Sequence, residues 1–317
     1  MKEFSRIFQY PKPELRYSEI QDRYAYDKKN FIVVISDGVT NSWHSESWAK
    51  FLVERFKKNP QFNKNYFKTF CKETIKDYSL PELEKNKIKN KAYKKIFEKR
   101  RQAGSAATFL AIKVDFDQKS CKYLNVGDSF LFHINSKDKI KAAINGDNDF
   151  ITTDKNKDIK VETGNIEFDD GEKIILATDG IGKYISLNKN SRDEIRKILD
   201  FDNFDNFKDF IWNSWNGSSD CKIDEDDITM AIINLSKSKK IKEYYPPNKG
   251  FSYEIEKKTN ILPKANIKKN ENKIIKDIRL KDIETKTKES SKISNLLSFK
   301  KQDSKISIVH FELKIEN

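Results

Sequence analysis

Seven short apolar runs, each bounded by turn-forming residues, constrain the fold of this chain most strongly. They are rich in β-branched and aromatic residues, as β-strands are, and cover residues 22–26, 31–36, 107–114, 122–126, 129–134, 173–178 and 228–235. Apolar residues at helical spacing predict helices over residues 48–56, 62–75, 81–96, 191–201 and 204–215. Runs of strands interrupted by blocks of helices predict an α+β fold with antiparallel sheets.

The positive charge of the chain is concentrated at its C-terminal end. Residues 237–317 hold 21 Lys and Arg against 11 Asp and Glu, whereas residues 1–236 hold 41 against 38. We therefore expect a domain over residues 1–236 and a Lys-rich, largely mobile tail over residues 237–317. Alternating Phe311, Leu313 and Ile315 predict a short terminal strand. A solvated tail is favoured over one that binds nucleic acid.

The remaining composition narrows the class of protein further. No apolar run approaches the roughly 18 residues of a membrane span, and the first residues lack the apolar centre of a signal peptide. Cys71, Cys121 and Cys221 are an odd number and form no C-x-x-C pair, which argues against a disulfide framework or a zinc ribbon. We expect a cytoplasmic protein.

Five aspartates lie where predicted strands begin or end. Asp37 and Asp179 follow two similar stretches, FIVVISDG and IILATDG; Asp128 lies in a predicted Gly-Asp hairpin turn; Asp22 and Asp226 precede strands. Alone, each is a common turn residue. If the strands share a sandwich, however, the five carboxylates meet at one edge, where they would repel one another and take up protons. Oxygen ligands without clustered His or Cys favour Mg²⁺ or Mn²⁺.

Two such ions, about 3.5–4 Å apart, lower the pKa of a bridging water so that it attacks phosphorus directly. No side-chain nucleophile is then needed. The sequence indeed lacks the G-x-S-x-G elbow, the cysteine-phosphatase pattern and the phosphate loop of nucleotide triphosphatases.

Six blocks in chain order carry a family resemblance: QDRYAY, VVISDGVTNSWHSESWAK, AGSAATFLAI, YLNVGDSFLFHI, IILATDGIGKYI and DDITMAII. Over roughly residues 17–235 they resemble the metal-dependent serine/threonine protein phosphatases of type 2C, most closely the bacterial branch with a Gln-Asp start. The resemblance implies a four-layer sandwich of two antiparallel sheets flanked by helix pairs. It also implies two Mn²⁺ or Mg²⁺ ions and a phosphoprotein substrate, which is either a partner kinase or a target of that kinase.

The resemblance assigns the metal ligands residue by residue. Asp37 matches the aspartate that bridges both ions, and Gly38 matches the glycine whose backbone carbonyl binds one of them. Asp179 and Asp226 match the ligands of the other ion, and Asp226 is preferred over Asp227 because the family ligand is the first acid of its pair.

Two further acids match positions near the ions. Asp128 resembles the ligand of a third, weaker ion, and Asp22 resembles the acid that holds metal-bound water. Thr108, in the small run AGSAAT, is interpreted as ordinary sheet packing.

The chain departs from the family pattern at three places. Gln21 replaces a Glu, and Tyr17 stands where many members have a phosphate-binding Arg; Arg16, one residue away, is the candidate substitute. The glycines that usually follow Asp37 and Gly38 are lost. Val39 stands where some members have a His, and His44 is expected at a helix start rather than as a proton donor.

Two other function classes remain open from the sequence. One is a catalytically silent phosphatase fold that serves as a binding module. The other is a two-metal nuclease, since acids at strand ends and a basic tail also suit phosphodiesters.

Overall fold

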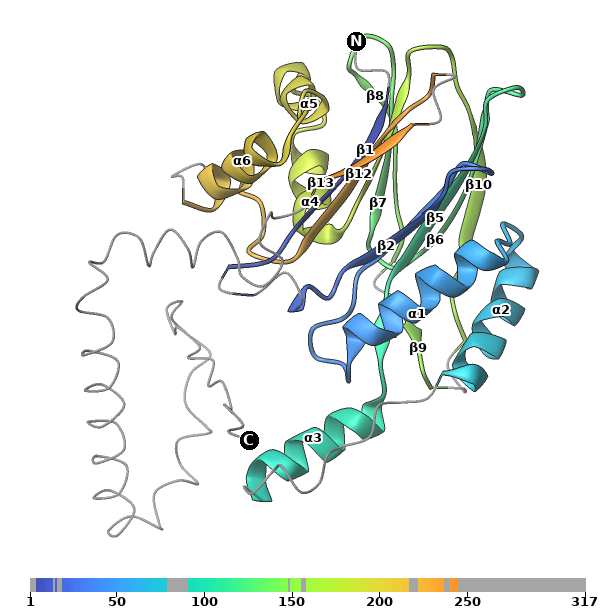
Figure 1. The fold of residues 1–317 in the computed structure, drawn as a ribbon, viewed down its shortest axis with the longest axis vertical. Coiled ribbons are helices and arrows are strands. Elements are labelled where there is room, and N and C mark those ends of the chain that lie inside the picture. The colour runs from blue at the N-terminus through green and yellow to red at the C-terminus, as the bar shows by residue number, and fades with distance from the viewer. Residues whose placement is uncertain are drawn as a thin grey trace, which may run out of the picture. The chain divides into compact units, whose positions relative to one another are not determined.

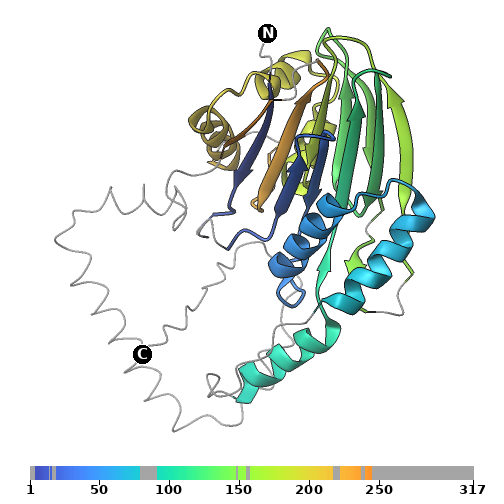
Figure 2. The same ribbon diagram turned by 45° about the vertical axis from the view of Figure 1, so that its right-hand side comes forward.

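The computed structural model describes residues 4–244 except residues 14, 16–18, 79–90, 148, 155–157, 217–221 and 237–239, and for residues 91–94, 96 and 97 it describes the backbone alone. Two large sheets lie face to face between layers of helices (Figures 1 and 2). The predicted α+β fold with four layers is confirmed. None of the helices in the described part of the chain combines the length and apolar character needed to cross a membrane.

The strands form two large sheets and one small one. The six-stranded sheet has the order β13 (Ile241–Tyr244), β1 (Ser5–Tyr10), β12 (Ile228–Asn234), β11 (Lys173–Ala177), β7 (Phe130–Ile134), β8 (Ile140–Asn145). The five-stranded sheet has the order β10 (Glu162–Glu167), β6 (Ser120–Val126), β5 (Phe109–Asp115), β3 (Ile32–Ser36), β2 (Arg23–Asp27). The small sheet pairs β4 (Ala106–Ala107) with β9 (Ile151–Thr152). All named pairs are antiparallel except β1 with β13.

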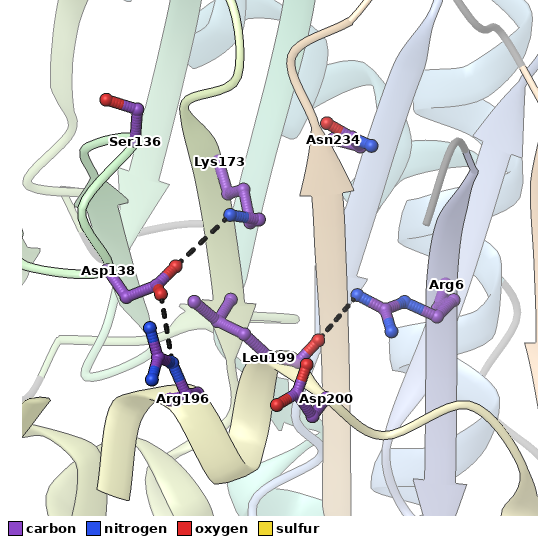
Figure 3. Close-up of a pocket in the computed structure, with 8 residues that line it drawn as sticks. All are labelled: Arg6, Ser136, Asp138, Lys173, Arg196, Leu199, Asp200 and Asn234. Carbon is purple, nitrogen blue, oxygen red and sulfur yellow. Dashed lines mark hydrogen bonds and ion pairs between the residues drawn. The ribbon is translucent and has the colours of Figure 1, made fainter. Parts of the chain in front are cut away.

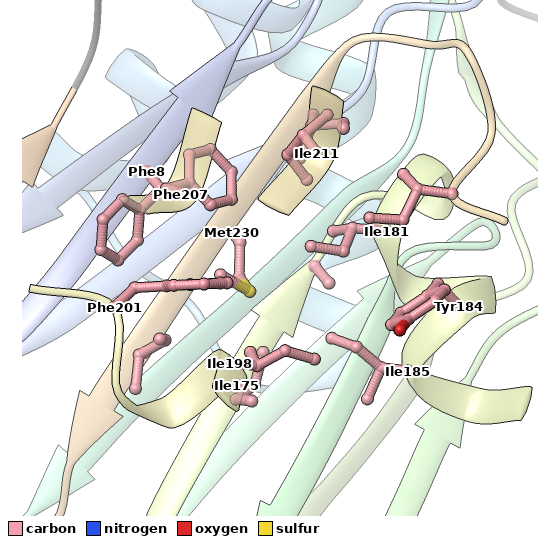
Figure 4. Close-up of a cluster of buried hydrophobic side chains, with 14 of the residues drawn as sticks. Phe8, Ile175, Ile181, Tyr184, Ile185, Ile198, Phe201, Phe207, Ile211 and Met230 are labelled. Carbon is pink, nitrogen blue, oxygen red and sulfur yellow. The ribbon is translucent and has the colours of Figure 1, made fainter. Parts of the chain in front are cut away.

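Alternation along the strands divides the interior into three apolar layers. In β3, Val33 and Ile35 face the other sheet, whereas Ile32 and Val34 face helices α1 (Ser45–Lys58) and α2 (Lys64–Asp77). On the six-stranded sheet the outward residues pack against α4 (Asp179–Leu187), α5 (Arg192–Leu199) and α6 (Phe204–Asn216), as Figure 4 shows. Because successive strand residues face opposite sides, one strand supplies two cores at once.

Helix α4 is absent from the sequence prediction because its first turn contains two glycines, which disfavour helices. At Gly182, packing requires glycine even though glycine disfavours a helix. A Cβ atom there would lie 2.2 Å from Cδ2 of Phe130, so the ring rests where any other residue would put a side chain. Asp179 is therefore the first residue of a helix, where its negative charge favours the helix dipole.

Helix α3 (Lys91–Ala103) lies in the predicted third helical region; the predicted start of that region falls within residues 79–90, outside the described residues. It projects from the sheets in both ribbon views (Figures 1 and 2). Each side chain that is described in α3 is exposed.

The six-stranded sheet extends past the predicted domain boundary at residue 236. Strand β13 pairs with β1, the Tyr244 ring stacks on Phe8 at 4.8 Å between centroids, and Glu243 accepts hydrogen bonds of 2.6 Å from Tyr24 and Tyr26. Residues 241–244 thus belong to the sheet. The predicted mobility of the tail and its terminal strand concern residues outside the described part.

We predict that a chain that ends at residue 236 is less stable than one that ends at residue 244. The shorter chain loses the edge strand, the stacked ring and both tyrosine hydrogen bonds, which together cost about 2–5 kcal/mol. Urea unfolding of the two chains measures the difference. Equal midpoints would show that β13 does not stabilise the sheet.

Candidate active site

Strand register brings two of the predicted acids together in the five-stranded sheet. Arg23 of β2 lies opposite Ser36 of β3, so Asp22, just before β2, and Asp37, just after β3, lie at neighbouring strand ends. The Asp37 carboxyl is within hydrogen-bonding reach of Asp22.

Register also groups the acids of the six-stranded sheet. Ala177, the last residue of β11, lies opposite Met230 of β12 and opposite Phe130 of β7. Asp179, Asp226 and Asp128 therefore follow or precede adjacent strand ends. Burial raises the pKa of Asp128, and the negative charges of Asp179 and Asp226 raise it further.

The two groups of acids meet through Thr178, which lies between β11 and α4. Its Oγ1 donates a hydrogen bond of 2.9 Å to Oδ2 of Asp22 and accepts one of 3.0 Å from the backbone N–H of Thr229. This hydroxyl thus connects the end of one sheet to the end of the other. The sequence contained its signal, since a small hydroxyl residue precedes each Asp-Gly.

Asp22 is fully buried, and burial raises its pKa to about 8, with further contributions from Asp227 and Asp226. The pKa of Asp37 is also well above its ordinary value, because of burial first and then of Asp22, Asp179 and Asp226. Two carboxyls this close cannot both ionise without a cation between or beside them.

Thr108 does more than pack within the sheet, so that sequence interpretation is wrong. Its Oγ1 accepts a 2.9 Å hydrogen bond from the backbone N–H of Asp37 and lies 2.9 Å from Oγ of Ser129. Its own N–H donates to the carbonyl of Asp37 at 2.8 Å. Thr108 therefore fixes the backbone on both sides of the Asp37 side chain and ties it to the Asp128 loop.

Gly38 lies where no side chain fits. A Cβ atom would come within 2.9 Å of the carbonyl of Gln21 and of the Ser45 Cβ at the start of α1. Because the backbone of Gln21 and of the helix cannot easily move, packing requires glycine at position 38. The carbonyl of Gly38 follows directly after Asp37 in the chain.

Asp226 and Asp227 differ in their hydrogen bonds and in their exposure. The buried Asp227 accepts from the backbone N–H groups of Lys12 at 3.0 Å and Gln21 at 2.7 Å, so both its oxygens are used to fix the loop before β2. Asp226 accepts one bond, from the N–H of Asp227, and its side chain is 41% exposed. The Asp226 carboxylate is thus less occupied by backbone hydrogen bonds than that of Asp227, and its choice as the metal ligand stays a prediction.

Two lysines border the acids and had no signal in the sequence. Lys183, one turn after Asp179 on α4, donates to it at 2.7 Å and to Asp224 at 3.1 Å. Lys12 lies 3.6 Å from Asp226 and donates to the Gln21 side chain at 3.3 Å. These ammonium groups partly neutralise the acids.

Asp128 does not lie in a hairpin, so the predicted turn type is wrong. The strand before it, β6, belongs to the five-stranded sheet, and the strand after it, β7, belongs to the six-stranded sheet. Gly127, at φ +100°, makes this crossing. The connection passes over the sheet ends, which explains why Asp128 reaches the other acids.

The residues present fit a divalent cation. In the described part of the chain no three His, Cys, Asp or Glu side chains are grouped closely enough to hold a metal ion as they stand. However, Oδ1 of Asp22 and Oδ1 of Asp179 are buried and accept no hydrogen bond from any described residue. Unpaired buried carboxylate oxygens among acids of raised pKa are what a hard cation stabilises.

The described contacts of His44 do not include any of the acids of the site. His44 lies at the start of α1 at φ 43°, makes no capping bond through its side chain, and instead contacts Glu46 at 3.2 Å. Its expected position at the start of a helix is confirmed, although its side chain does not cap that helix. Arg16 and Tyr17 lie outside the described residues.

A cavity of about 150 Å³ lies at the opposite end of the six-stranded sheet (Figure 3). Its charges are paired internally: Asp138 contacts Lys173 and Arg196, both at 3.4 Å, and Arg6 donates to the carbonyl of Leu199 at 3.0 Å. This arrangement ties α5 to the sheet and is separate from the cluster of acids.

The sequence of this chain matches the model of a known protein family. The family model for protein phosphatase 2C matches residues 17–226, two thirds of the chain. The chain belongs to the protein phosphatase 2C family, the type 2C serine/threonine protein phosphatases.

Solved structures of such enzymes are similar to this chain at low identity. A bacterial serine phosphatase is 16% identical, with 74% of this chain and 98% of that chain covered, at a TM-score of 0.49. The serine/threonine phosphatase Stp1 from Staphylococcus aureus is 17% identical, with coverage of 73% and 94%, at 0.48. RsbX in complex with magnesium is 18% identical, with coverage of 71% and 92%, at 0.41. No curated protein sequence matches this chain.

We predict that Thr108→Val weakens Mn²⁺ binding, because the N–H of Asp37 loses its buried acceptor, at a cost of about 1–3 kcal/mol. Thr108→Ser keeps the hydroxyl and is the matched control. Calorimetric titration with Mn²⁺ measures both. Equal affinities in the Val and Ser variants would contradict the positioning role.

The raised pKa of Asp22 predicts how stability depends on pH in the metal-free protein. An acid whose pKa rises on folding from 3.8 to about 8 destabilises the fold increasingly as the pH increases between those values. With chelator present, melting temperature should fall from pH 6 to pH 9. Asp22→Asn should reduce this fall and the exposed control Asp117→Asn should not; an unchanged slope in Asp22→Asn would refute the assignment.

Proposed function

We propose that this protein hydrolyses phosphoserine and phosphothreonine in proteins with two divalent cations, Mn²⁺ or Mg²⁺. The observation that carries the proposal is the convergence of acids from both sheets at one end, with raised pKa values and unpaired buried oxygens.

Each acid has a place in this proposal. Asp37 would lie between the two ions, the carbonyl of Gly38 would bind one of them, and Asp179 and Asp226 would bind the other. Asp128 would hold a third, weaker ion. When bound, the ions would supply a water of lowered pKa and positive charge for the substrate phosphate.

The remaining roles belong to groups of the chain itself. Thr108 holds the Asp37 backbone, and Thr178 orients Asp22 through Oδ2. Oδ1 of Asp22 is buried and accepts no hydrogen bond from a described residue, which supports the proposal that this oxygen accepts a hydrogen bond from a water among the acids.

All the acids expected of an active member are present, which supports an enzyme over a silent binding module. Substrate choice separates a phosphatase from a two-metal nuclease. A phosphoserine peptide and nitrophenyl phosphate with Mn²⁺ test the first, and single-stranded DNA with Mg²⁺ tests the second.

We predict that chelation abolishes phosphate release and that Mn²⁺ restores it. Asp37→Asn should lose at least ~10²-fold in kcat/KM while it stays folded, because one charge of the metal site is removed. Asp117→Asn, in an exposed turn, is the control. Full activity of Asp37→Asn, or cleavage of DNA without phosphatase activity, would overturn the proposal.

A further inference from the structure

Helix α3 differs from the other helices of the five-stranded sheet in its charge. It holds six Lys and Arg and a single acid, Glu98, in 13 residues, whereas α1 and α2 carry both signs. Arg100 and Arg101 in the last turn stabilise the helix dipole, which explains two of the six cations. The other four need a different reason.

The described cations of α3 have no partners within the described part of the chain. The side chains of Lys95, Lys99, Arg100 and Arg101 are exposed and make no hydrogen bond or ion pair there. Lys95 and Lys99 lie one helical turn apart, a spacing at which like charges destabilise a helix. An anionic partner would remove that repulsion.

The end of α3 is fixed beside the acids. Gly104 stops the helix at φ +77°, and a Cβ atom there would lie 2.3 Å from Oγ1 of Thr153, so no other residue fits. The Gly104 carbonyl accepts from the N–H of Trp43 at 3.0 Å, and the Ala106 carbonyl accepts from the N–H of Val39 at 3.0 Å. The loop that follows Asp37 is thus joined to the first residues after α3.

The distance from the basic helix to the acids follows from this connection. Ala107 bridges to Gly38, and the six residue steps from Arg101 to Ala107 span at most roughly 22 Å, which is an upper limit for the distance. An extended peptide covers that length in about six or seven residues.

From these observations we infer that α3 is a docking surface for an acidic segment of the phosphoprotein substrate, about six to eight residues from the phosphorylated residue. The inference rests on the proposed function and names its substrate class. Acidic side chains near the phosphate would be repelled by the aspartates of the site. At α3 they meet cations that no described residue pairs, which attract the substrate and speed its association.

The test compares phosphoserine peptides that carry three Glu or three Gln six to eight residues from the phosphoserine, on either side. The variant replaces Lys99, Arg100 and Arg101 by Gln, a good helix former. Its matched control replaces Lys113, Lys122 and Lys139, exposed residues near the opposite ends of their strands. Nitrophenyl phosphate, which is too small to reach α3, reports the basal activity of each protein.

The unsubstituted protein should prefer one acidic peptide over its neutral form roughly 5- to 10-fold in kcat/KM at low salt, mainly through KM. The α3 variant should lose this preference and the control should keep it, with nitrophenyl phosphate turnover equal in all. Replacement of the same three residues by Glu should invert the preference, and 0.5 M salt should weaken it.

Failure of this inference and failure of the proposed function give different results. Absence of nitrophenyl phosphate turnover with Mn²⁺ would refute the phosphatase itself. Turnover without a preference for either acidic peptide, or a preference that survives in the α3 variant, would refute the docking surface alone. Loss of RNA binding in the variant without a change in peptide preference would instead assign α3 to nucleic acid.

Discussion

The repulsion among buried carboxylates at one end of the two sheets is the constraint on which the rest of this structure depends. Antiparallel register places Asp22 beside Asp37, and Asp179 beside Asp226. Without a cation, burial and the neighbouring negative charges raise the pKa of Asp22 to about 8 and also raise the pKa of Asp37. Hydroxyl groups hold them in place despite that cost: Thr108 fixes Asp37, and Thr178 connects Asp22 to the opposite sheet. A fold that maintains such an arrangement is organised to bind positive charge.

The sequence predicts the central strands of both large sheets, because apolar runs bounded by turn residues are a local property, but it does not predict β1, β8, β10 or β13. Strands β3, β5, β11 and β12 were all found, and their alternate residues fill different cores. Strand β1 was missed because its polar residues are explained only by distant partners. Arg6 donates to the carbonyl of Leu199, and Gln9 donates to Thr229 and to the carbonyl of Asp22. No pattern within six residues contains that information.

The predicted site shows the same division between local and distant causes. The position of each acid at a strand end can be predicted, since apolar runs and Asp-Gly steps are visible in the sequence. The roles of Thr108 and Lys12 depend on which strand ends become neighbours, and register across two sheets is not encoded in any single segment. The sequence predicts a hairpin at Gly127, where the chain in fact crosses from one sheet to the other, and this prediction fails for the same reason.

The end of the molecule that holds the candidate active site combines negative charge, from the acids, with positive charge, from helix α3. Whether the acids bind divalent cations can be measured in crystals grown with Mn²⁺, at a wavelength that gives manganese anomalous scattering. We expect two strong anomalous peaks bridged by Asp37, one beside the Gly38 carbonyl and one beside Asp179 and Asp226. Peaks held by other residues, or none among these acids at saturating Mn²⁺, would contradict it.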